Sequence, residues 1–103
     1  MAVQEYLNVR SDTVTLPTPE MLEAITRAAL GDDNRGEDPT VRALEELAAN
    51  ILGKEAALLT TSGQLSNSLA VLTHATRGDE VIMEETSHIF TSEQGAISMF
   101  GGM

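Results

Sequence analysis

Two short stretches of this chain carry groups suited to binding and chemistry. The first is Ser62-Gly63-Gln64, which lies between an apolar run and a segment with helical spacing. Backbone N–H groups at the start of a helix and the positive end of its dipole suit a phosphate, and Ser62 adds a hydroxyl donor. The second is His88, a few residues beyond the next apolar run. The pattern predicts an anion site with an imidazole in the same region.

Each stretch also has a simpler explanation. Serine and glycine often cap a helix in such turns, and a single histidine in a loop is often only a surface residue. No Lys-Ser/Thr pair follows the glycine, so the turn is not a Walker loop. Ser62, His88 and Asp79 do not form a hydrolase triad, since the Gly-x-Ser-x-Gly elbow is absent. Glu84 and Glu85 with His88 are too few and too loosely spaced for a metal site, so no metal is expected.

The elements around these residues predict a βαβ unit. Residues 56–60 and 80–83 are short apolar runs typical of covered strands, and residues 64–76 have the leucine spacing of a helix. A βαβ connection is right-handed and places both strand C-termini at one edge of the sheet. The Ser-Gly turn and His88 are therefore expected at that edge, where open α/β sheets bind ligands. Residues 87–100 are expected to form a loop and a final helix.

The N-terminal half predicts an extended arm and two helices. Residues 1–18 form the arm, which contains the polar run Arg-Ser-Asp-Thr at 10–13, most simply a solvated strand. Helices are expected over 19–29 and 39–52, each opening with a proline after a capping Thr or Asp. The acidic loop at residues 31–37 has no apolar residue and predicts a charged turn. Residues 19–103 are expected to belong to one α/β domain, of which they form the N-terminal portion.

The composition narrows the classes of function. Sixteen acidic residues against six Lys and Arg give a formal charge of −10, which repels nucleic-acid phosphates and anionic lipids. Neither nucleic acid nor a membrane is therefore expected as a partner. The chain has no cysteine, which excludes disulfides and thiol catalysis. Residues 1–7 lack a secretory pattern and no stretch has membrane-spanning length, so a cytoplasmic location is expected.

Ordered sequence motifs together resemble the low-specificity threonine aldolases, within the β-eliminating lyase group of pyridoxal-phosphate enzymes. The resemblance runs from about Asn8 to Gly102, and motifs in order along nearly the whole chain are much more specific than any one alone. They are Arg-Ser-Asp-Thr-Val-Thr at 10–15, Gly-Asp-Asp at 31–33, Gly-Glu-Asp-Pro-Thr at 36–40, Gly-Lys-Glu-Ala-Ala at 53–57, Ser62-Gly63, Gly-Asp-Glu-Val at 78–81 and Ser-His-Ile at 87–89.

The resemblance implies the N-terminal portion of a fold-type I, pyridoxal-phosphate-dependent large domain. It places the cofactor phosphate against Ser62, Gly63 and Gln64, and it stacks the catalytic residue His88 on the pyridine ring, where an imidazole relays a proton. Ser11 would lie near the substrate carboxylate. The implied reaction cleaves L-threonine or L-allo-threonine to glycine and acetaldehyde, in a homo-oligomer with shared sites.

Two residues depart from the family pattern, and one expected residue type is missing. Gln64 stands where the family has threonine, but its backbone N–H is kept, whereas Arg35 replaces a tyrosine in the loop that reaches a neighbouring site. The family's covalent lysine, its aspartate facing the pyridine nitrogen and its carboxylate-binding arginine belong to a part beyond Met103. The single lysine, Lys54, is expected at the opposite sheet edge from the site. The chain alone is therefore expected to be inactive.

Two other hypotheses stay open at this point. The chain fits a fragment of another fold-type I lyase or aminotransferase, because the residues that would distinguish these enzymes belong to the later part. It also fits a non-catalytic module that binds phosphate or pairs with another subunit through its apolar faces.

Overall fold

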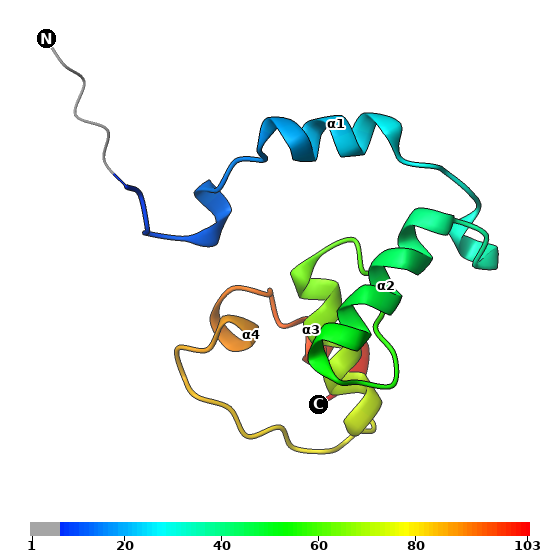
Figure 1. Ribbon diagram of the computed structural model, residues 1–103. Coiled ribbons are helices and arrows are strands. Elements are labelled where there is room, and N and C mark those ends of the chain that lie inside the picture. Colours follow the sequence, from blue (N-terminus) through cyan, green and yellow to red (C-terminus); the bar gives the residue numbers. More distant parts are fainter. Residues whose placement is uncertain (1–6) are drawn as a thin grey trace, which may run out of the picture. The chain divides into compact units, whose positions relative to one another are not determined.

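The computed structural model describes residues 7–103, and the regular elements in that range are all helical (Figure 1). The chain divides into two compact units, one ending at Lys54 and the other beginning at Glu55. In order, the elements are the 3₁₀ turns and helices η1 (Asp12–Val14), α1 (Pro19–Arg27), η2 (Asp33–Arg35), α2 (Pro39–Leu52), α3 (Gly63–His74) and α4 (His88–Thr91), and the π-helical segment η3 (Ile97–Gly101).

The two helices of the first unit begin where their capping residues predict. Thr18 Oγ1 accepts a hydrogen bond from the N–H of Met21 at 3.3 Å, and α1 then begins at Pro19. Asp38 Oδ1 accepts from two N–H groups in the first turn of α2, and Gly53 ends that helix with a left-handed φ of 62°. The predicted start of each helix is confirmed, while α1 ends two residues before its predicted end.

The acidic loop between α1 and α2 is tied together at its ends. Asp38 is only 8% exposed, and its second oxygen accepts from the N–H of Gly31 at 2.9 Å. The Thr40 hydroxyl donates to the carbonyl of Ala29 at 2.6 Å. A Cβ on Gly31 would collide with the backbone of Glu37, so the loop closes tightly at this glycine. The expected charged turn is therefore a folded clamp in which Asp38 both caps α2 and closes the loop.

The second unit is built on α3. Ser62 caps this helix by accepting from the N–H of Leu65 at 3.2 Å, and the helix ends at His74, close to its predicted end. The segment η3 packs against α3, where Ala96 and Ile97 are buried. The predicted final helix is instead two short pieces, α4 and η3, because the chain between them turns through left-handed backbone.

The predicted strands are absent from the described part of the chain. Residues 56–60 and 80–83 are irregular there, so the expected βαβ unit is not formed. Ile82 is 100% exposed and Leu58 is 72% exposed, although covered strands would bury such side chains. A pair of strands is marginal without further strands beside it and helices on its faces. The prediction of strands at these two runs is therefore wrong for residues 7–103, where neither run forms a strand ladder.

The N-terminal arm also differs from its expected form. Residues 12–14 form the turn η1 rather than an extended strand, because the Ser11 hydroxyl accepts from the N–H of Thr13 at 3.2 Å and closes the backbone. The structure places its division at Lys54 and Glu55. A boundary between the arm and the domain at residue 18 stays a prediction, and residues 1–6 lie outside the described residues.

Candidate functional site

The turn before α3 presents unused donors to open space. Ser62 accepts from Leu65, and its carbonyl accepts from the N–H of Ser66, which satisfies part of the first helical turn. Among residues 7–103, the N–H groups of Gly63 and Gln64 have no acceptor, and the Ser62 hydroxyl proton is not donated. A Cβ built on Gly63 would meet nothing within 4 Å. Three donors without an acceptor therefore lie in an exposed turn at the positive end of a helix of 12 residues.

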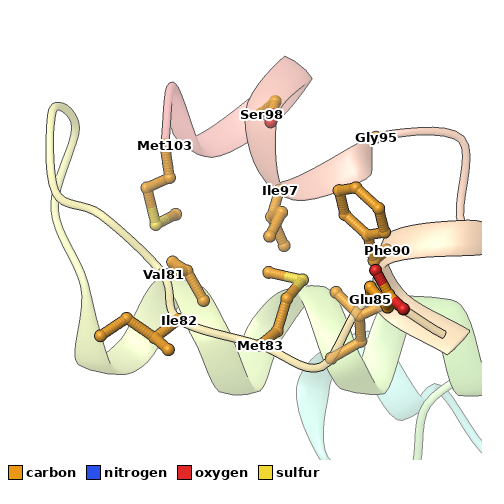
Figure 2. A pocket seen from close by; sticks show the side chains of 10 residues that line it. Val81, Ile82, Met83, Glu85, Phe90, Gly95, Ile97, Ser98 and Met103 are labelled. Atoms are coloured by element: carbon orange, nitrogen blue, oxygen red, sulfur yellow. The ribbon is translucent and has the colours of Figure 1, made fainter. Parts of the chain in front are cut away.

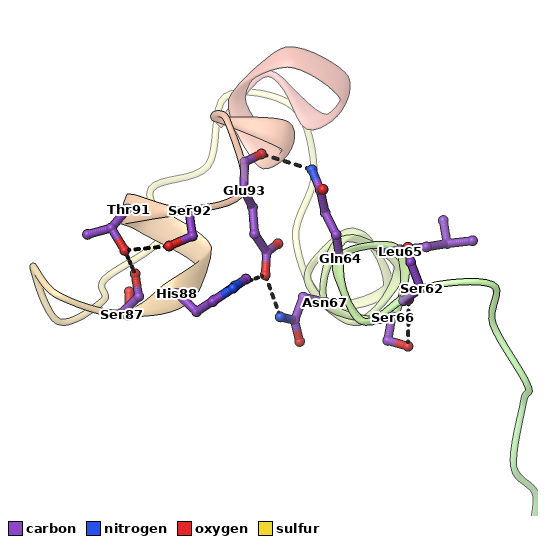
Figure 3. A network of polar contacts seen from close by, with 10 residues as sticks. All are labelled: Ser62, Gln64, Leu65, Ser66, Asn67, Ser87, His88, Thr91, Ser92 and Glu93. Carbon is purple, nitrogen blue, oxygen red and sulfur yellow. Dashed lines mark hydrogen bonds and ion pairs between the residues drawn. The ribbon is translucent and has the colours of Figure 1, made fainter. Parts of the chain in front are cut away.

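A buried carboxylate connects this helix to His88 (Figure 3). Glu93 is 1% exposed, and its Oε1 accepts from Nδ2 of Asn67 at 2.6 Å. The same oxygen lies 2.9 Å from Nδ1 of His88, the first residue of α4. The backbone carbonyl of Glu93 accepts from Nε2 of Gln64 at 3.0 Å. Glu93 therefore joins the first turns of α3 to the imidazole.

The charge state of Glu93 follows from these contacts. The hydrogen bonds from Asn67 and then from His88 hold the pKa of Glu93 below its ordinary value, although its burial acts in the opposite direction. The carboxylate is therefore ionised at neutral pH, and an ionised carboxylate only accepts hydrogen bonds. Its other oxygen, Oε2, is buried without a hydrogen-bond partner. The imidazole of His88 is on the outside of this cluster, with 71% of the side chain exposed.

The backbone after α4 explains why Glu93 points inward. Gln94 and Gly95 both adopt left-handed backbone, with φ of 57° and 67°. Such a conformation is costly for a residue other than glycine, and here it turns the chain back toward η3. Because η3 packs on α3, this turn directs the Glu93 side chain toward Asn67.

The structure brings together four of the five residues predicted for the site. Ser62, Gly63 and Gln64 form the start of α3, and Gln64 and His88 both hydrogen bond to Glu93. Ser11 belongs to the other unit, where its hydroxyl contacts Asp12 and Thr13. The binding roles of all five residues stay predictions.

Two residues of this cluster, Glu93 and Asn67, were not found from the sequence. Asn67 is three residues after Gln64, so both amides lie on one face of α3, and that polar face next to the turn was a usable signal. Glu93 is five residues after His88, which is not a helical spacing. Nothing local to Glu93 indicates that its side chain is buried.

Two hollows lie in the described part of the second unit, and His88 lines neither of them. The larger, of about 480 Å³, is mainly apolar (Figure 2) and is lined by Val81, Ile82, Met83, Glu85, Ile89, Phe90, Gly95, Ile97, Ser98 and Met103. The smaller, of about 370 Å³, is bordered by Ser62 and Gln64 and by apolar side chains of α3 and η3. The larger hollow suits packing of further apolar groups, whereas the donors of the turn lie beside the smaller one.

The chain belongs to the beta-eliminating lyase family, whose model matches residues 8–103. It is 47% identical over 102 residues to low-specificity L-threonine aldolase 1 of Arabidopsis thaliana, covering 98% of this chain and 28% of that protein. It is 43% identical over 97 residues to the low specificity L-threonine aldolase of Escherichia coli K12, covering 94% of this chain and 29% of that protein. The yeast (Saccharomyces cerevisiae) low specificity L-threonine aldolase is 39% identical, covering 89% of this chain and 24% of that protein.

These comparisons confirm the resemblance drawn from the sequence motifs. The chain spans between about a quarter and a third of the length of the curated relatives it matches. The family fits the predicted fold-type I class, although the strands of that class are absent from residues 7–103.

Proposed function

We propose that this chain is the N-terminal portion of a pyridoxal-phosphate-dependent aldolase that cleaves L-threonine or L-allo-threonine to glycine and acetaldehyde. The observation that carries the proposal is the identity to low-specificity threonine aldolases, which extends over 94% to 98% of the chain. The geometry also supports it, because the first turn of α3 has free backbone donors and its Gln64 shares the partner Glu93 with an exposed imidazole.

The residues of the turn fit the phosphate of this cofactor. The N–H groups of Gly63 and Gln64 and the hydroxyl of Ser62 are free to donate, and the space in front of Gly63 is open. These donors supply the local positive potential that a chain with a net charge of −10 otherwise lacks. Gln64 differs from the usual family residue, but it binds through its backbone, and its side chain holds Glu93.

His88 would stack on the pyridine ring of the bound cofactor and hold it flat. Its side chain is 71% exposed and contacts Glu93 only through the ring edge at Nδ1, which supports stacking of a planar ligand on the imidazole. When bound, the cofactor supplies an electron sink for the electron pair left on the substrate as its carbon–carbon bond breaks. Ser11 would bind the substrate carboxylate through its hydroxyl.

The remaining groups would come from the rest of a longer protein. Lys54 is exposed and follows Gly53, the residue that caps the end of α2, in the unit that does not contain Ser62 and His88. We propose that the covalent lysine, the aspartate and the arginine of the family lie elsewhere, and that the 103-residue chain alone is inactive. Residues 56–60 and 80–83 would then be strands of a parallel sheet, and the longer protein would form a homo-oligomer with shared sites.

The test begins with the DNA downstream of codon 103. We expect the reading frame to continue there, as the length of the relatives suggests. The longer protein is then purified, supplied with pyridoxal 5′-phosphate and assayed for acetaldehyde and glycine from L-threonine and L-allo-threonine, with the 103-residue chain as the control. We expect cleavage by the longer protein and none by the chain alone. Efficient cleavage by the chain alone would refute its inactivity, and transamination without cleavage would point to an aminotransferase instead.

A further inference from the structure

We infer that Glu93 is a positioning residue that fixes His88 as the Nδ1–H tautomer, so that Nε2 is the free acceptor of the site. The catalytic meaning of this assignment rests on the proposed function. The assignment itself rests on the geometry around one carboxylate oxygen, which lies 2.9 Å from Nδ1 of His88 and 2.6 Å from Nδ2 of Asn67.

The chemistry of the pair determines which nitrogen carries the proton. An ionised carboxylate has no proton to donate, so the 2.9 Å contact is a hydrogen bond only if Nδ1 carries one. In a neutral imidazole the proton on Nδ1 leaves Nε2 with its lone pair. A carboxylate that binds one ring nitrogen in this way also fixes the orientation of the ring.

The carboxylate is held in place more firmly than the histidine it contacts. Glu93 is 1% exposed, whereas the His88 side chain is 71% exposed. The Glu93 backbone is held by Nε2 of Gln64 at 3.0 Å, and its carboxylate is held by Asn67. Because both holding residues lie on α3, the imidazole is fixed relative to the same helix whose first turn presents Gly63 and Gln64.

The arrangement therefore couples the ring to the anion site. With Nδ1 occupied by Glu93, Nε2 is the ring atom able to accept a hydrogen bond or hold a proton from a ligand bound in front of α3. In the other tautomer Nε2 would carry a proton and act as a donor. It could then not accept the proton of a substrate hydroxyl.

The test measures the tautomer directly, without cofactor or substrate. The chain contains two histidines, so His74→Gln provides a background in which His88 is the only imidazole. Long-range ¹H–¹⁵N spectra at a pH where the ring is neutral then identify the protonated nitrogen. We expect predominantly Nδ1–H in this background, and a shift toward Nε2–H when Glu93→Gln is added, because a neutral amide both donates and accepts.

Matched variants separate positioning from general effects. Glu80→Gln removes an exposed carboxylate of the same unit and should leave the tautomer unchanged. If Glu93→Gln loses its helices by circular dichroism, Glu93→Asp takes its place, since it keeps the charge but shortens the reach to Nδ1. A His88 ring that is mainly Nε2–H in the His74→Gln background with Glu93 intact, or a tautomer that neither Glu93 variant changes, overturns the inference. Because no ligand is present, failure here is distinct from failure of the aldolase assay.

Discussion

The sharpest prediction concerns Ser62, because one residue serves both as the cap of α3 and as a proposed phosphate donor. Ser62→Ala removes the hydrogen bond to the N–H of Leu65 and should destabilise the helix by about 1 kcal/mol. It also removes a donor to an anion, worth about 1.5–3 kcal/mol, so phosphate affinity should fall roughly 10- to 100-fold. Ser62→Asp is more informative, since aspartate caps a helix as well as serine does.

The two variants separate stability from binding. A carboxylate about 4 Å from a phosphate is repelled by about 1 kcal/mol per unit charge in water and about 4 kcal/mol at a partly shielded surface. Ser62→Asp should therefore keep the helix while lowering anion affinity by a further factor of roughly 5 to 1,000. If the phosphate does not bind at the first turn of α3, Ser62→Asp should instead bind the ligand as tightly as the wild type does.

The assay uses pyridoxine 5′-phosphate, which has the ring and the phosphate but no aldehyde to react with Lys54 or the N-terminus. Binding is followed by the amide NMR shifts of Gly63 and Gln64, and helix stability by thermal unfolding. Thr18→Asp, the same change at the cap of α1, is the control and should leave affinity unchanged. The reasoning is refuted if Ser62→Asp binds the ligand as tightly as the wild type, or if Thr18→Asp weakens binding equally.

Three further predictions concern the units themselves. Gly31→Ala should lower the free energy of unfolding by about 1–3 kcal/mol in denaturant titration, because the added Cβ collides with the backbone of Glu37. An unchanged midpoint would contradict the tight closure of the loop at Gly31. Hydrogen bonds from Val41 and then Gly31 lower the pKa of Asp38. The ionised Asp38 therefore stabilises the fold at neutral pH, and this stabilisation is lost as the pH falls below the ordinary aspartate pKa. Asp38→Asn should flatten this dependence of the melting temperature on acid pH. Ile97→Ala should lower the free energy of unfolding by about 2 kcal/mol in chemical denaturation. This is near the low end for such changes, because the side chain already borders a hollow. A loss below about 0.5 kcal/mol would show that η3 contributes little packing.

The parts of the fold that depend on neighbouring residues could be predicted from the sequence. Thr18, Asp38 and Ser62 each precede a helix directly and accept from an N–H group two or three residues further along, so the start of each helix was encoded locally. The apolar runs at 56–60 and 80–83 encode strands only where other strands lie beside them. Their outcome depends on partners that residues 7–103 do not contain, and local pattern cannot supply them.

In the candidate site, too, the features set by neighbouring residues could be predicted, and those set by distant residues could not. The turn at Ser62 and Gly63 was predicted because a helix start is a local feature. Glu93 was missed because its burial depends on Gln64 and Asn67, which are 29 and 26 residues away. Its inward direction also depends on the left-handed backbone at Gln94, for which the sequence offers no obvious sign. The group that orients the histidine was therefore harder to find than the histidine itself.

The apolar side chains left uncovered on α1 and α2, such as Met21, Ile25 and Ile51, have a consequence for the isolated chain in solution. Such surfaces attract one another, and the ten excess negative charges are what keeps two copies apart. Added salt shortens the range of that repulsion to a few ångströms without weakening the attraction. The chain should therefore stay dispersed in dilute buffer and cluster as sodium chloride is raised, the reverse of a protein held together by ion pairs.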